Sequence, residues 1–504
     1  MKIDVNSLPN DPEQLKQMLL ELQKVVAEKD SELAKKDAQI HGLLARYNAK
    51  LAKEFGKKSE KMPGAGEVFN EAEALLDEQD KAILADVQQE QKAKTQPKRK
   101  PLPEHIIELN EQDKVCDCCH TPLQKMGEIS SEALEYVPAH IKVIKTIRGK
   151  YACRHCERAG VESVIKTAPM PATPIPRSIA TASLLAQVIS HKYQFGLPLY
   201  RQETLFDEIG IALNRKIMSS WIMRCSELLE PLYLELKHTL LSQEVLHADE
   251  TPVNVLNSDT AKSYMWLYCS GDDKPMGNSN VVLFDYQNSR AGSCPKDFLE
   301  GFNGYMHVDG YAAYEQTNAN LVACLAHMRR KFLEAKPNTK KTGKADVALS
   351  LITKLYGIEQ SVKGKSVNEI YETRQKQAKP IVDKFKHWLT EHEDKIPPKS
   401  ALGQAIKYSL NQFDKFERYL EDGRLKIDNN RSERAIKPFV IGRKAWLFSN
   451  TCNGARASAI LYSIVETAKV NNLIVTDYLR TCLQRLSENP VDVEPLLPWN
   501  VDMG

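Results

Sequence analysis

The sequence predicts a multidomain α+β protein, and three observations lead to this fold class. In the first 61 residues, apolar residues recur every seven positions. Two Cys-x-x-Cys pairs follow, and short apolar runs bounded by polar residues begin at residue 244. Such short runs are typical of buried strands, whereas apolar residues three and four apart are typical of helices. A length of 504 residues is enough for several domains with at least one sizeable core.

The composition excludes several classes of protein. Hydrophobic residues make up 42% and charged residues 27% of the chain, as in an ordinary globular protein. No apolar run of about 18 residues appears, which predicts no membrane span, and the polar N-terminus lacks a signal-peptide core. Eleven cysteines without a secretory signal predict a reducing, cytoplasmic location. Since the net charge is only +3 and the pI about 8.1, any DNA binding must come from local basic patches.

Residues 1–61 are predicted to form an N-terminal coiled coil. The apolar positions that fall seven apart are Leu19, Val26, Leu33, Ile40 and Tyr47. Lys29 and Lys36 break the companion seam, so the coiled coil would be imperfect. We expect it to join copies of the chain into a homo-oligomer, with a lone solvated helix as the alternative. Residues 62–104 follow as a flexible linker that is first acidic and then basic and proline-rich.

Residues 105–165 are predicted to be a zinc-binding ribbon. Two Cys-x-x-Cys pairs are separated by 33 residues, and the pairs consist of Cys116, Cys119, Cys153 and Cys156. Each pair can present two thiolates to one tetrahedral Zn²⁺, which would be structural because four protein ligands leave no open position. The alternating sequence over 141–147 favours a strand. Redox or free cysteines are the alternative, and Cys118, His120 and His155 are further ligand candidates.

Residues 166–240 are predicted to be a helical DNA-binding domain. Two helix-like stretches flank Gly210, which supplies a turn, and Asn214 can cap the second stretch. This pattern favours a helix-turn-helix, in which Arg215 and Lys216, together with Ser219, would face the DNA groove. An ordinary helical bundle fits the same pattern.

Residues 241–335 are predicted to be the first part of an α/β catalytic core. Five strands are expected, over 245–248, 264–269, 281–284, 305–308 and 321–324. Helices are expected over 290–302, between the third and fourth strands, and over 327–334. Three strands, a helix and a strand, followed by a further strand and helix, is the order of a ribonuclease-H-like fold.

Acidic residues end two of these predicted strands. Asp249 follows the first strand and Asp309 the fourth, and the predicted strand order allows them to lie side by side. Since an unpaired buried charge is too costly to keep, and two close carboxylates raise each other's pKa, these residues need a cationic partner. Two Mg²⁺ ions, about 3.5–4 Å apart, would satisfy both carboxylates and activate a nucleophile.

A helical insertion is predicted over 336–424, with helices near 347–358, 370–389 and 401–420. The second part of the core, 425–475, then begins with a helix at 429–437 that can bring Glu433 to the metal ions. Basic residues crowd this part and are expected to hold DNA phosphates: Arg431, Arg434, Lys437, Arg443 and Lys444. Residues 476–504 are predicted to be a C-terminal tail.

Each acid also has a simpler interpretation. Asp309 precedes Gly310, and an Asp-Gly pair often marks a turn. Glu250, next to Asp249, is an alternative metal ligand, and Glu433 can pair with Lys437 one helical turn on. Together, after two cysteine pairs and beside a basic helix, the three acids favour catalysis.

At this point the sequence resembles the transposases of the insertion sequence 66 family. Residues 428–448 are similar to the block that carries the family's third acid, and His247-Ala-Asp-Glu-Thr251 and His307-Val-Asp-Gly-Tyr311 to its first two blocks. The segments 55–61 and 192–202 and the cysteine pairs resemble its N-terminal blocks. The resemblance covers nearly the whole chain.

This resemblance implies a transposase with an Asp-Asp-Glu (DDE) active site formed by Asp249, Asp309 and Glu433. Cys324 and His327 resemble a Cys-x-x-His signature of DDE transposases with insertions, although a packed strand-to-helix corner would look the same. The family also implies binding to DNA at the element ends and the target, two small accessory proteins of the same element, and Mg²⁺ or Mn²⁺ as cofactor.

The predicted reaction is Mg²⁺-dependent cleavage of the element's 3′ ends at its terminal inverted repeats, followed by strand transfer to target DNA. Two other functions fit parts of the sequence. One is an inactive DNA-binding protein that kept the fold, which the presence of all three acids disfavours. The other is a ribonuclease-H-like nuclease or junction resolvase, which the zinc ribbon, the coiled coil and the long insertion disfavour.

Overall fold

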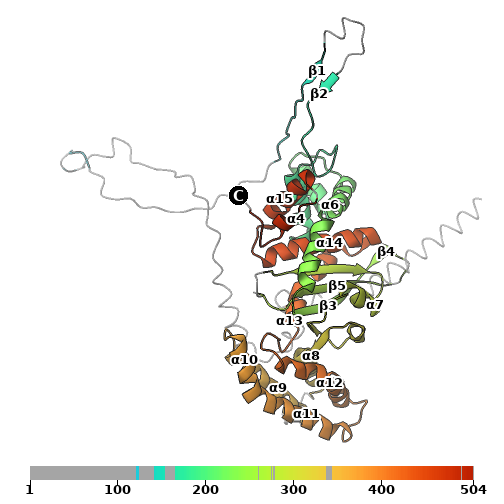
Figure 1. Cartoon of the computed structure of the whole chain (residues 1–504), viewed down its shortest axis with the longest axis vertical. Helices are drawn as coiled ribbons and strands as arrows, with labels where there is room; N and C mark the ends of the chain where they lie inside the picture. Colours follow the sequence, from blue (N-terminus) through green and yellow to red (C-terminus); the bar gives the residue numbers. More distant parts are fainter. Residues whose placement is uncertain are drawn as a thin grey trace, which may run out of the picture. The chain divides into compact units, whose positions relative to one another are not determined.

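The computed structural model describes residues 118, 121–123, 141–153, 165–258, 260, 262–273, 275, 279–336, 343–489 and 491–502. The chain divides into two compact units, Met1–Glu71 and Ala72–Gly504. The predicted coiled coil (1–61) and linker (62–104) lie outside the described residues. The described part is a mixed α/β structure in which helices surround one five-stranded sheet (Figure 1).

The five predicted strands of the core are present and form this one sheet. Its order is β6 (Val282–Gln287), β5 (Ser263–Ser270), β3 (Val245–Val253), β7 (Tyr305–Val308) and β8 (Asn320–Ala323). Strand β5 is antiparallel to both of its neighbours, whereas β7 and β8 run parallel to β3. Strand β3 extends five residues beyond its predicted end because it pairs with β5 as far as Val253.

Large side chains alternate between the two faces of the sheet, as strand geometry requires. On one face, Tyr268 stacks on Phe298 of α7 (Ser293–Phe298) with ring centroids 4.1 Å apart. Trp266, two residues earlier, contacts Tyr314 of the 3₁₀ helix η4 (Ala312–Gln316). Helix α7 is shorter than the helix predicted over 290–302.

The opposite face of the sheet is covered by α13 (Asn430–Trp446) and α14 (Cys452–Val470). Phe284 of β6 contacts Phe439 of α13 and Tyr462 of α14. Helix α14 also caps the outer edge of β6, because the Ser463 and Thr467 hydroxyls accept hydrogen bonds from β6 amides at 2.7 and 3.1 Å. An edge strand with satisfied amides offers no template for further pairing.

Four further helices share one hydrophobic core with the sheet. They are α4 (Ala182–Tyr193), α5 (Leu199–Glu208), α6 (Arg215–Leu241) and α15 (Val475–Glu488). Helix α15 and the turn η7 (Glu494–Leu496) lie in the segment predicted as a tail. Tyr478 of α15 is fully buried, and its hydroxyl donates to the Leu496 carbonyl at 2.7 Å. This segment therefore belongs to the folded core.

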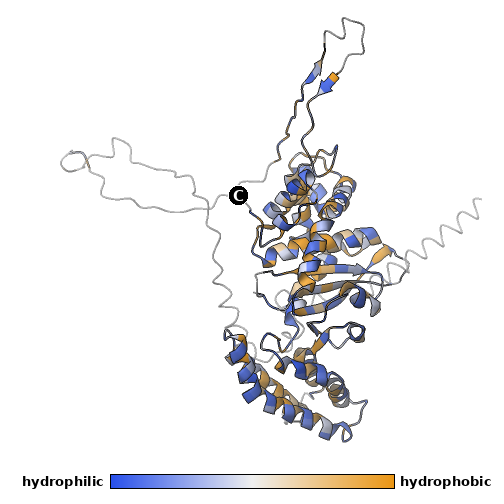
Figure 2. Cartoon of the chain, viewed as in Figure 1, coloured by the Kyte–Doolittle hydropathy of each residue, from blue (hydrophilic) through white to orange (hydrophobic). Residues whose placement is uncertain are grey.

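The segment after β8 is helical, as predicted for the helix at 327–334 and for the insertion at 336–424. It contains α8 (Leu325–Glu334), α9 (Lys344–Ser361), α10 (Val367–Thr373), the π-helical η5 (Arg374–Ala378), α11 (Lys379–Glu393), α12 (Ala401–Glu417) and η6 (Arg418–Leu420). These helices are two-sided in hydropathy (Figure 2). Their buried residues form a second core cluster that includes Phe332, Leu355, Phe385 and Phe413 and reaches Val322 of β8.

Arg374 joins this helical segment to the chain that returns to the sheet. Its buried guanidinium pairs with Glu359 of α9, with N–O distances of 2.6 and 2.9 Å. It also donates to the carbonyls of Tyr419, Asp422 and Leu425 at 2.9–3.1 Å. One side chain therefore holds the end of the insertion beside the start of the second core segment.

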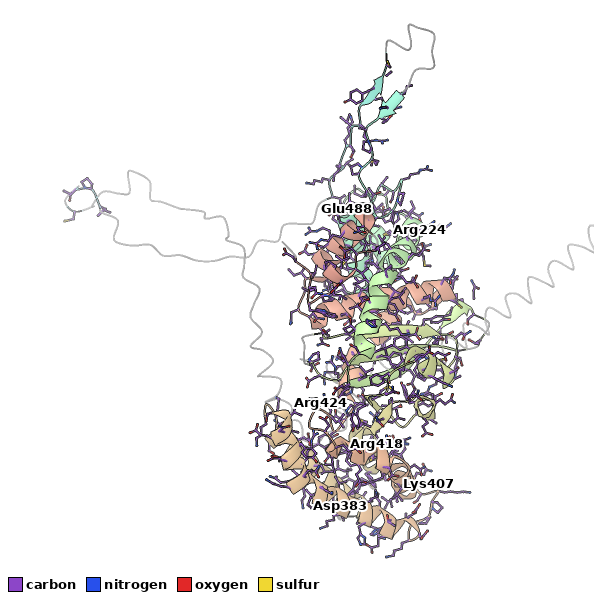
Figure 3. The ribbon with its side chains drawn as sticks, viewed as in Figure 1. Arg224, Asp383, Lys407, Arg418, Arg424 and Glu488 are labelled. Atoms are coloured by element: carbon purple, nitrogen blue, oxygen red, sulfur yellow. The ribbon has the colours of Figure 1, made fainter. Side chains whose placement is uncertain are left out.

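Arg418 and Arg424 make further contacts at this junction (Figure 3). Arg418 donates to the Leu321 carbonyl of β8 at 3.2 Å. Arg424 pairs with Asp422 at 2.7 Å and with Glu244, the residue before β3.

Two small sheets complete the described structure. Strand β1 (Lys150–Ala152) pairs antiparallel with β2 (Ile165–Thr167), and β4 (Val255–Asn257) pairs parallel with β9 (Ser449–Thr451). The strand predicted over 141–147 is wrong, because residues 141–149 are neither helix nor strand. Val143, Ile144 and Ile147 are exposed, and Ile141 is partly buried. Across the described ranges, no helix combines the length and the apolar character needed to cross a membrane.

Candidate active site

The site is built on the two central parallel strands. His247 of β3 and His307 of β7 are register partners, and their rings stack at 4.3 Å. Asp249 and Asp309 each follow two residues after these histidines. Because side chains two apart share a face of a strand, both carboxylates belong on the face that the histidines occupy. This is the side-by-side arrangement that the predicted strand order allows.

The carboxylate of Asp249 lies in an unfavourable electrostatic environment. Burial raises its pKa well above the usual value, and the nearby charges of Glu250, Asp309 and Glu433 raise it further. The hydrogen bond from the Glu250 amide, 2.8 Å from Oδ1, opposes this shift. Both other predicted acids thus lie close enough to Asp249 to act on its charge. A divalent cation would remove this repulsion.

Asp309 directly follows β7 and begins a turn, so the turn that the Asp-Gly pair predicted is present. Its Oδ1 accepts a hydrogen bond from the Tyr311 amide at 2.9 Å, which is an Asx-turn contact. A Cβ on Gly310 would lie 2.7 Å from the Tyr408 hydroxyl of α12. The absence of a side chain at Gly310 therefore lets the insertion pack directly against the Asp309 turn.

Glu250 lies on the opposite face of β3 from Asp249. Its side chain is 2% exposed and pairs with Arg290, whose Nε lies 3.1 Å from Oε1. The Tyr314 hydroxyl donates to the other carboxylate oxygen at 2.7 Å. Burial and Asp309 raise the pKa of Glu250, and both hydrogen-bond partners oppose the rise. These partners satisfy the Glu250 carboxylate without a metal ion. The hydrogen bond described for Asp249 comes from a backbone amide instead.

Glu433 lies in the first turn of α13, which packs against β3. The helix is anchored by Asn429, the residue before it. The Asn429 amide side chain donates to the Ala248 carbonyl at 2.9 Å and contacts His247 Nδ1 at 2.7 Å. These contacts fix the start of α13 beside the strand that carries Asp249, and they bring Glu433 to the site from 184 residues farther along the chain.

Cys324 and His327 lie next to Glu433. Potential ligand atoms of Cys324, His327 and Glu433 all lie within 4.8 Å of one another. Cys324 is the residue before α8, and its sulfur accepts a hydrogen bond from the Asn429 amide at 3.1 Å. Burial, with Asp428 and Glu433 nearby, raises the pKa of its thiol. The pair therefore forms a packed strand-to-helix corner that also touches the candidate site.

Several of the predicted phosphate-binding residues contact protein groups. Arg431 is buried, and its guanidinium contacts the Ser270 carbonyl, Asp273 and Asn280. Arg443 donates to the Thr251 hydroxyl at 3.0 Å, and burial lowers its pKa. Arg434 is mostly exposed and pairs with Asp273 at 3.2 Å. Lys437 is partly exposed and Lys444 is exposed.

The two predicted helices that flank Gly210 are present as α5 and the start of α6. Gly210 has φ +79°, a left-handed conformation that suits glycine, and Asn214 caps α6 by accepting from the Lys216 amide at 2.8 Å. Arg215 and Lys216, at the start of α6, and Ser219, one turn on, are exposed. Glu203 of α5 accepts from the Arg215 amide at 3.2 Å and ties the two helices together.

Of the predicted zinc ligands, Cys153 lies directly after β1 and is exposed. Cys116, Cys119 and Cys156 lie outside the described residues.

Three residues of the site were not predicted from the sequence as parts of it: His247, His307 and Asn429. All three are buried, at 0%, 0% and 2% exposure. Burial lowers the pKa of His247 to about 3 and that of His307 well below its usual value, so both rings are neutral at neutral pH. The signal that could have revealed the two histidines is a His-x-Asp triplet that begins on each of the two central parallel strands.

Comparisons with known proteins identify the class. The family model "Transposase IS66 family" matches residues 177–457, which include all three acids. The model "zinc-finger binding domain of transposase IS66" matches 113–157, the segment with both cysteine pairs. A third model, "Transposase C of IS166 homeodomain", matches 42–107. The protein is thus of the transposase class, with a zinc-finger domain.

Relatives are similar over nearly the full length of the chain. Uncharacterized proteins y4jD and y4qI of Sinorhizobium fredii are 31% and 32% identical to it, and the similarity covers 99% of this chain and 98% and 99% of theirs. The uncharacterized protein y4hP of the same organism is 30% identical over 80% of this chain and 77% of its own. No solved structure gives a significant match. The chain belongs to the IS66 transposase family.

Proposed function

We propose that the protein is a DDE transposase that cleaves the ends of its insertion sequence and joins them to target DNA. Asp249, Asp309 and Glu433 are its catalytic residues. The observation that carries this proposal is that three acids from distant parts of the chain converge: Asp249 lies on β3, Asp309 directly follows the parallel neighbour β7, and Glu433 lies on the helix that packs against β3. Three acids from distant parts of the chain at one site are expected where a divalent metal ion binds.

The strand order supports a ribonuclease-H-like core. Three antiparallel strands are followed by two parallel ones, in the spatial order third, second, first, fourth, fifth. Asp249 lies on the first strand of this series and Asp309 directly after the fourth, while Glu433 arrives on a later helix. The insertion then separates the third acid from the first two in sequence but not in space.

The acids fit Mg²⁺ or Mn²⁺, which prefer carboxylate oxygens. When bound, such ions activate the nucleophile and stabilise the leaving oxygen of an in-line displacement. The protein supplies the three carboxylates and the buried, fixed elements that hold them. Water is the nucleophile for end cleavage and the freed 3′-hydroxyl is the nucleophile for strand transfer, so no covalent enzyme intermediate is needed.

DNA binding is proposed for the exposed basic residues. Arg215 and Lys216 at the start of α6 fit the groove-facing position of a helix-turn-helix, and Arg434, Lys437 and Lys444 on α13 fit phosphate contacts. Arg431 and Arg443 would act indirectly, because their guanidinium groups hold β5 and β3 against α13.

The remaining proposals concern the N-terminal half and the partners. Cys116, Cys119, Cys153 and Cys156 are the proposed ligands of a structural Zn²⁺, within the segment that matches the zinc-finger model. The coiled coil at 1–61 is proposed to form a homo-oligomer. Two small accessory proteins of the same element are further proposed partners.

An end-cleavage assay with the full chain tests the catalytic proposal. Wild-type protein should nick DNA carrying the element's terminal inverted repeats when Mg²⁺ is added, and Asp249→Ala should lose this activity by at least about a thousandfold while it retains end binding. A variant that still transfers strands in Mg²⁺ would refute the assignment. Binding without cleavage by the wild-type protein would instead favour an inactive DNA-binding protein, and cleavage without end specificity would favour a nuclease.

A further inference from the structure

Three buried polar side chains lie just before the three acids in the sequence and form one layer. His247 and His307 precede Asp249 and Asp309 by two residues on their strands. Asn429 precedes Glu433 by one helical turn, and the Glu433 amide contacts the Asn429 carbonyl at 3.4 Å. Because two residues along a strand return to the same face, His247 shares the Asp249 face of β3. His307 lies near the end of β7, just before Asp309, and Asn429 directly precedes α13, whose first turn carries Glu433.

The three side chains contact one another in series. The rings of His307 and His247 stack with centroids 4.3 Å apart and an angle of 15° between their planes. His247 Nδ1 lies 2.7 Å from Asn429 Oδ1. The layer therefore runs without a break from β7 through β3 to the start of α13, in the same order as the three acids.

The hydrogen bonds of Asn429 determine which atoms donate. Its Nδ2 donates to the Ala248 carbonyl at 2.9 Å, so Oδ1 must be the acceptor and His247 Nδ1 must carry the proton. The Asn429 backbone amide donates to the Cys324 sulfur at 3.1 Å. Asn429 thus ties α13 to β3 through its side chain and to the start of α8 through its backbone.

The chain that enters α13 is held on the other side as well. The Lys426 amide donates to His307 Nε2 at 3.1 Å, and the Leu325 amide donates to the Ile427 carbonyl at 3.0 Å. Each of these bonds attaches the segment just before Glu433 to a different element of the core. The position of Glu433 relative to the two aspartates is therefore set by contacts of this layer.

We propose that His247, His307 and Asn429 are positioning residues that hold the three carboxylates at the spacing a divalent metal ion requires. The inference rests on the proposed function for the role of the acids. Residues behind metal ligands that are locked by hydrogen bonds typically change metal affinity by about 10- to 100-fold when replaced. A layer that merely fills space would tolerate any replacement of similar size and stability.

Two matched substitutions separate these roles. In His247→Asn, the amide nitrogen of the shorter side chain reaches the position of Nδ1 and can still donate to Asn429 Oδ1. In His247→Gln, the amide nitrogen reaches the position of Nε2 and that bond is lost. Both variants lose the ring and its stacking on His307, so their thermal stability serves as the control.

The measurements are Mn²⁺ binding, followed by electron paramagnetic resonance, and the Mg²⁺ concentration that half-saturates end cleavage. Both use the full chain, with Asp249→Ala as the reference for loss of the site. We expect His247→Gln to weaken Mn²⁺ binding and raise the half-saturating Mg²⁺ concentration by about tenfold or more relative to His247→Asn. Asn429→Leu should behave like His247→Gln.

The outcomes separate this inference from the proposed function. Equal Mn²⁺ affinity in the two His247 variants overturns the inference, even when the wild-type protein cleaves DNA. Mn²⁺ binding that Asp249→Ala abolishes and His247→Gln weakens supports the inference, even when no DNA is cleaved and the proposed function fails. A wild-type protein that binds no Mn²⁺ at the acids overturns both.

Discussion

At the scale of single residues, the site holds carboxylates that repel one another. Asp249 is buried beside two other carboxylates, and its nearest hydrogen-bond donor is the adjacent Glu250 amide. Its neighbour Glu250, whose side chain is 2% exposed, has Arg290 and Tyr314 as partners. This difference between adjacent residues supports the proposal that Asp249, and not Glu250, binds the metal ion.

Asp249→Asn should therefore stabilise the metal-free protein. The pKa of Asp249 is raised in the folded state, so ionising this carboxyl group is less favourable in the folded protein than in the unfolded chain. Replacing it with a neutral amide should therefore raise the free energy of unfolding at neutral pH by about 1 kcal/mol or more. Chemical denaturation with a chelator present measures this. Excess Mg²⁺ should reverse the order, because it stabilises only the wild type. A destabilised metal-free variant would contradict the account.

Because His247 is buried, it should make the stability of the folded protein fall as the pH falls. Its folded-state pKa is about 3 and the unfolded value is about 6.5, so the unfolded chain binds more protons between these values and stability falls as the pH falls. The stability of wild-type protein relative to His247→Asn should fall by about 1.4 kcal/mol per pH unit below pH 6.5. Denaturation curves at pH 7 and pH 5 test this, and parallel curves for the two proteins would refute a neutral buried His247.

At the scale of elements, hydrogen bonds at a few positions hold distant segments in place. The turn between α5 and α6 depends on Gly210 and on the Asn214 cap, both of which follow from the sequence. The return of the chain from the insertion depends on Arg374, which the sequence did not single out. Its partners are mostly backbone carbonyls, and no side-chain pattern reveals these.

Two glycine substitutions should have opposite effects. Gly210→Ala forces a side chain into a left-handed conformation and should cost about 1 kcal/mol. Gly357→Ala lies inside α9, where an added Cβ meets nothing within 4 Å, and should stabilise by about 0.5–1 kcal/mol. Thermal unfolding of the two variants measures both, and a shift in the same direction would contradict the described backbone.

Arg374→Met should be among the most damaging substitutions outside the site. It leaves Glu359 without its buried partner and three carbonyls without a donor, and should cost about 3–5 kcal/mol. The control is Lys395→Met, which breaks an exposed pair with Glu391 and should cost less than about 0.5 kcal/mol. Similar losses in the two variants would show that Arg374 does not hold the insertion.

At the scale of the whole molecule, the strands and the helical insertion followed from local patterns, because their apolar runs and periodicity lie within each segment. The insertion has a core cluster of its own, but the predicted boundaries at residues 240 and 475 do not appear as breaks in the core. The helices α4, α5, α6 and α15 share one hydrophobic cluster with the sheet, and α15 lies where a tail was expected. Packing between segments distant in sequence leaves no local signal, so it could not be predicted.

The same reasoning applies to the site. Asp249 and Asp309 could be placed together from strand order, since register alone brings adjacent parallel strands into line. Glu433 could not, because its position depends on contacts of Asn429 with residues more than 100 positions away. Side chains alternate along β3, so Asp249 and Glu250 lie on opposite faces of the sheet. Which of the two shares a face with Glu433 depends on the face that α13 covers, and the sequence does not show this.

The most direct test of the central claim, that Asp249, Asp309 and Glu433 form one metal centre, is to locate Mn²⁺ by anomalous scattering in crystals of the protein with DNA ends. The account predicts anomalous peaks bounded by Asp249 and Asp309, with Glu433 as a ligand, and their loss in Asp249→Ala. Mn²⁺ found only at Cys324 and His327, or no peak beside Asp249 at saturating Mn²⁺, would contradict it.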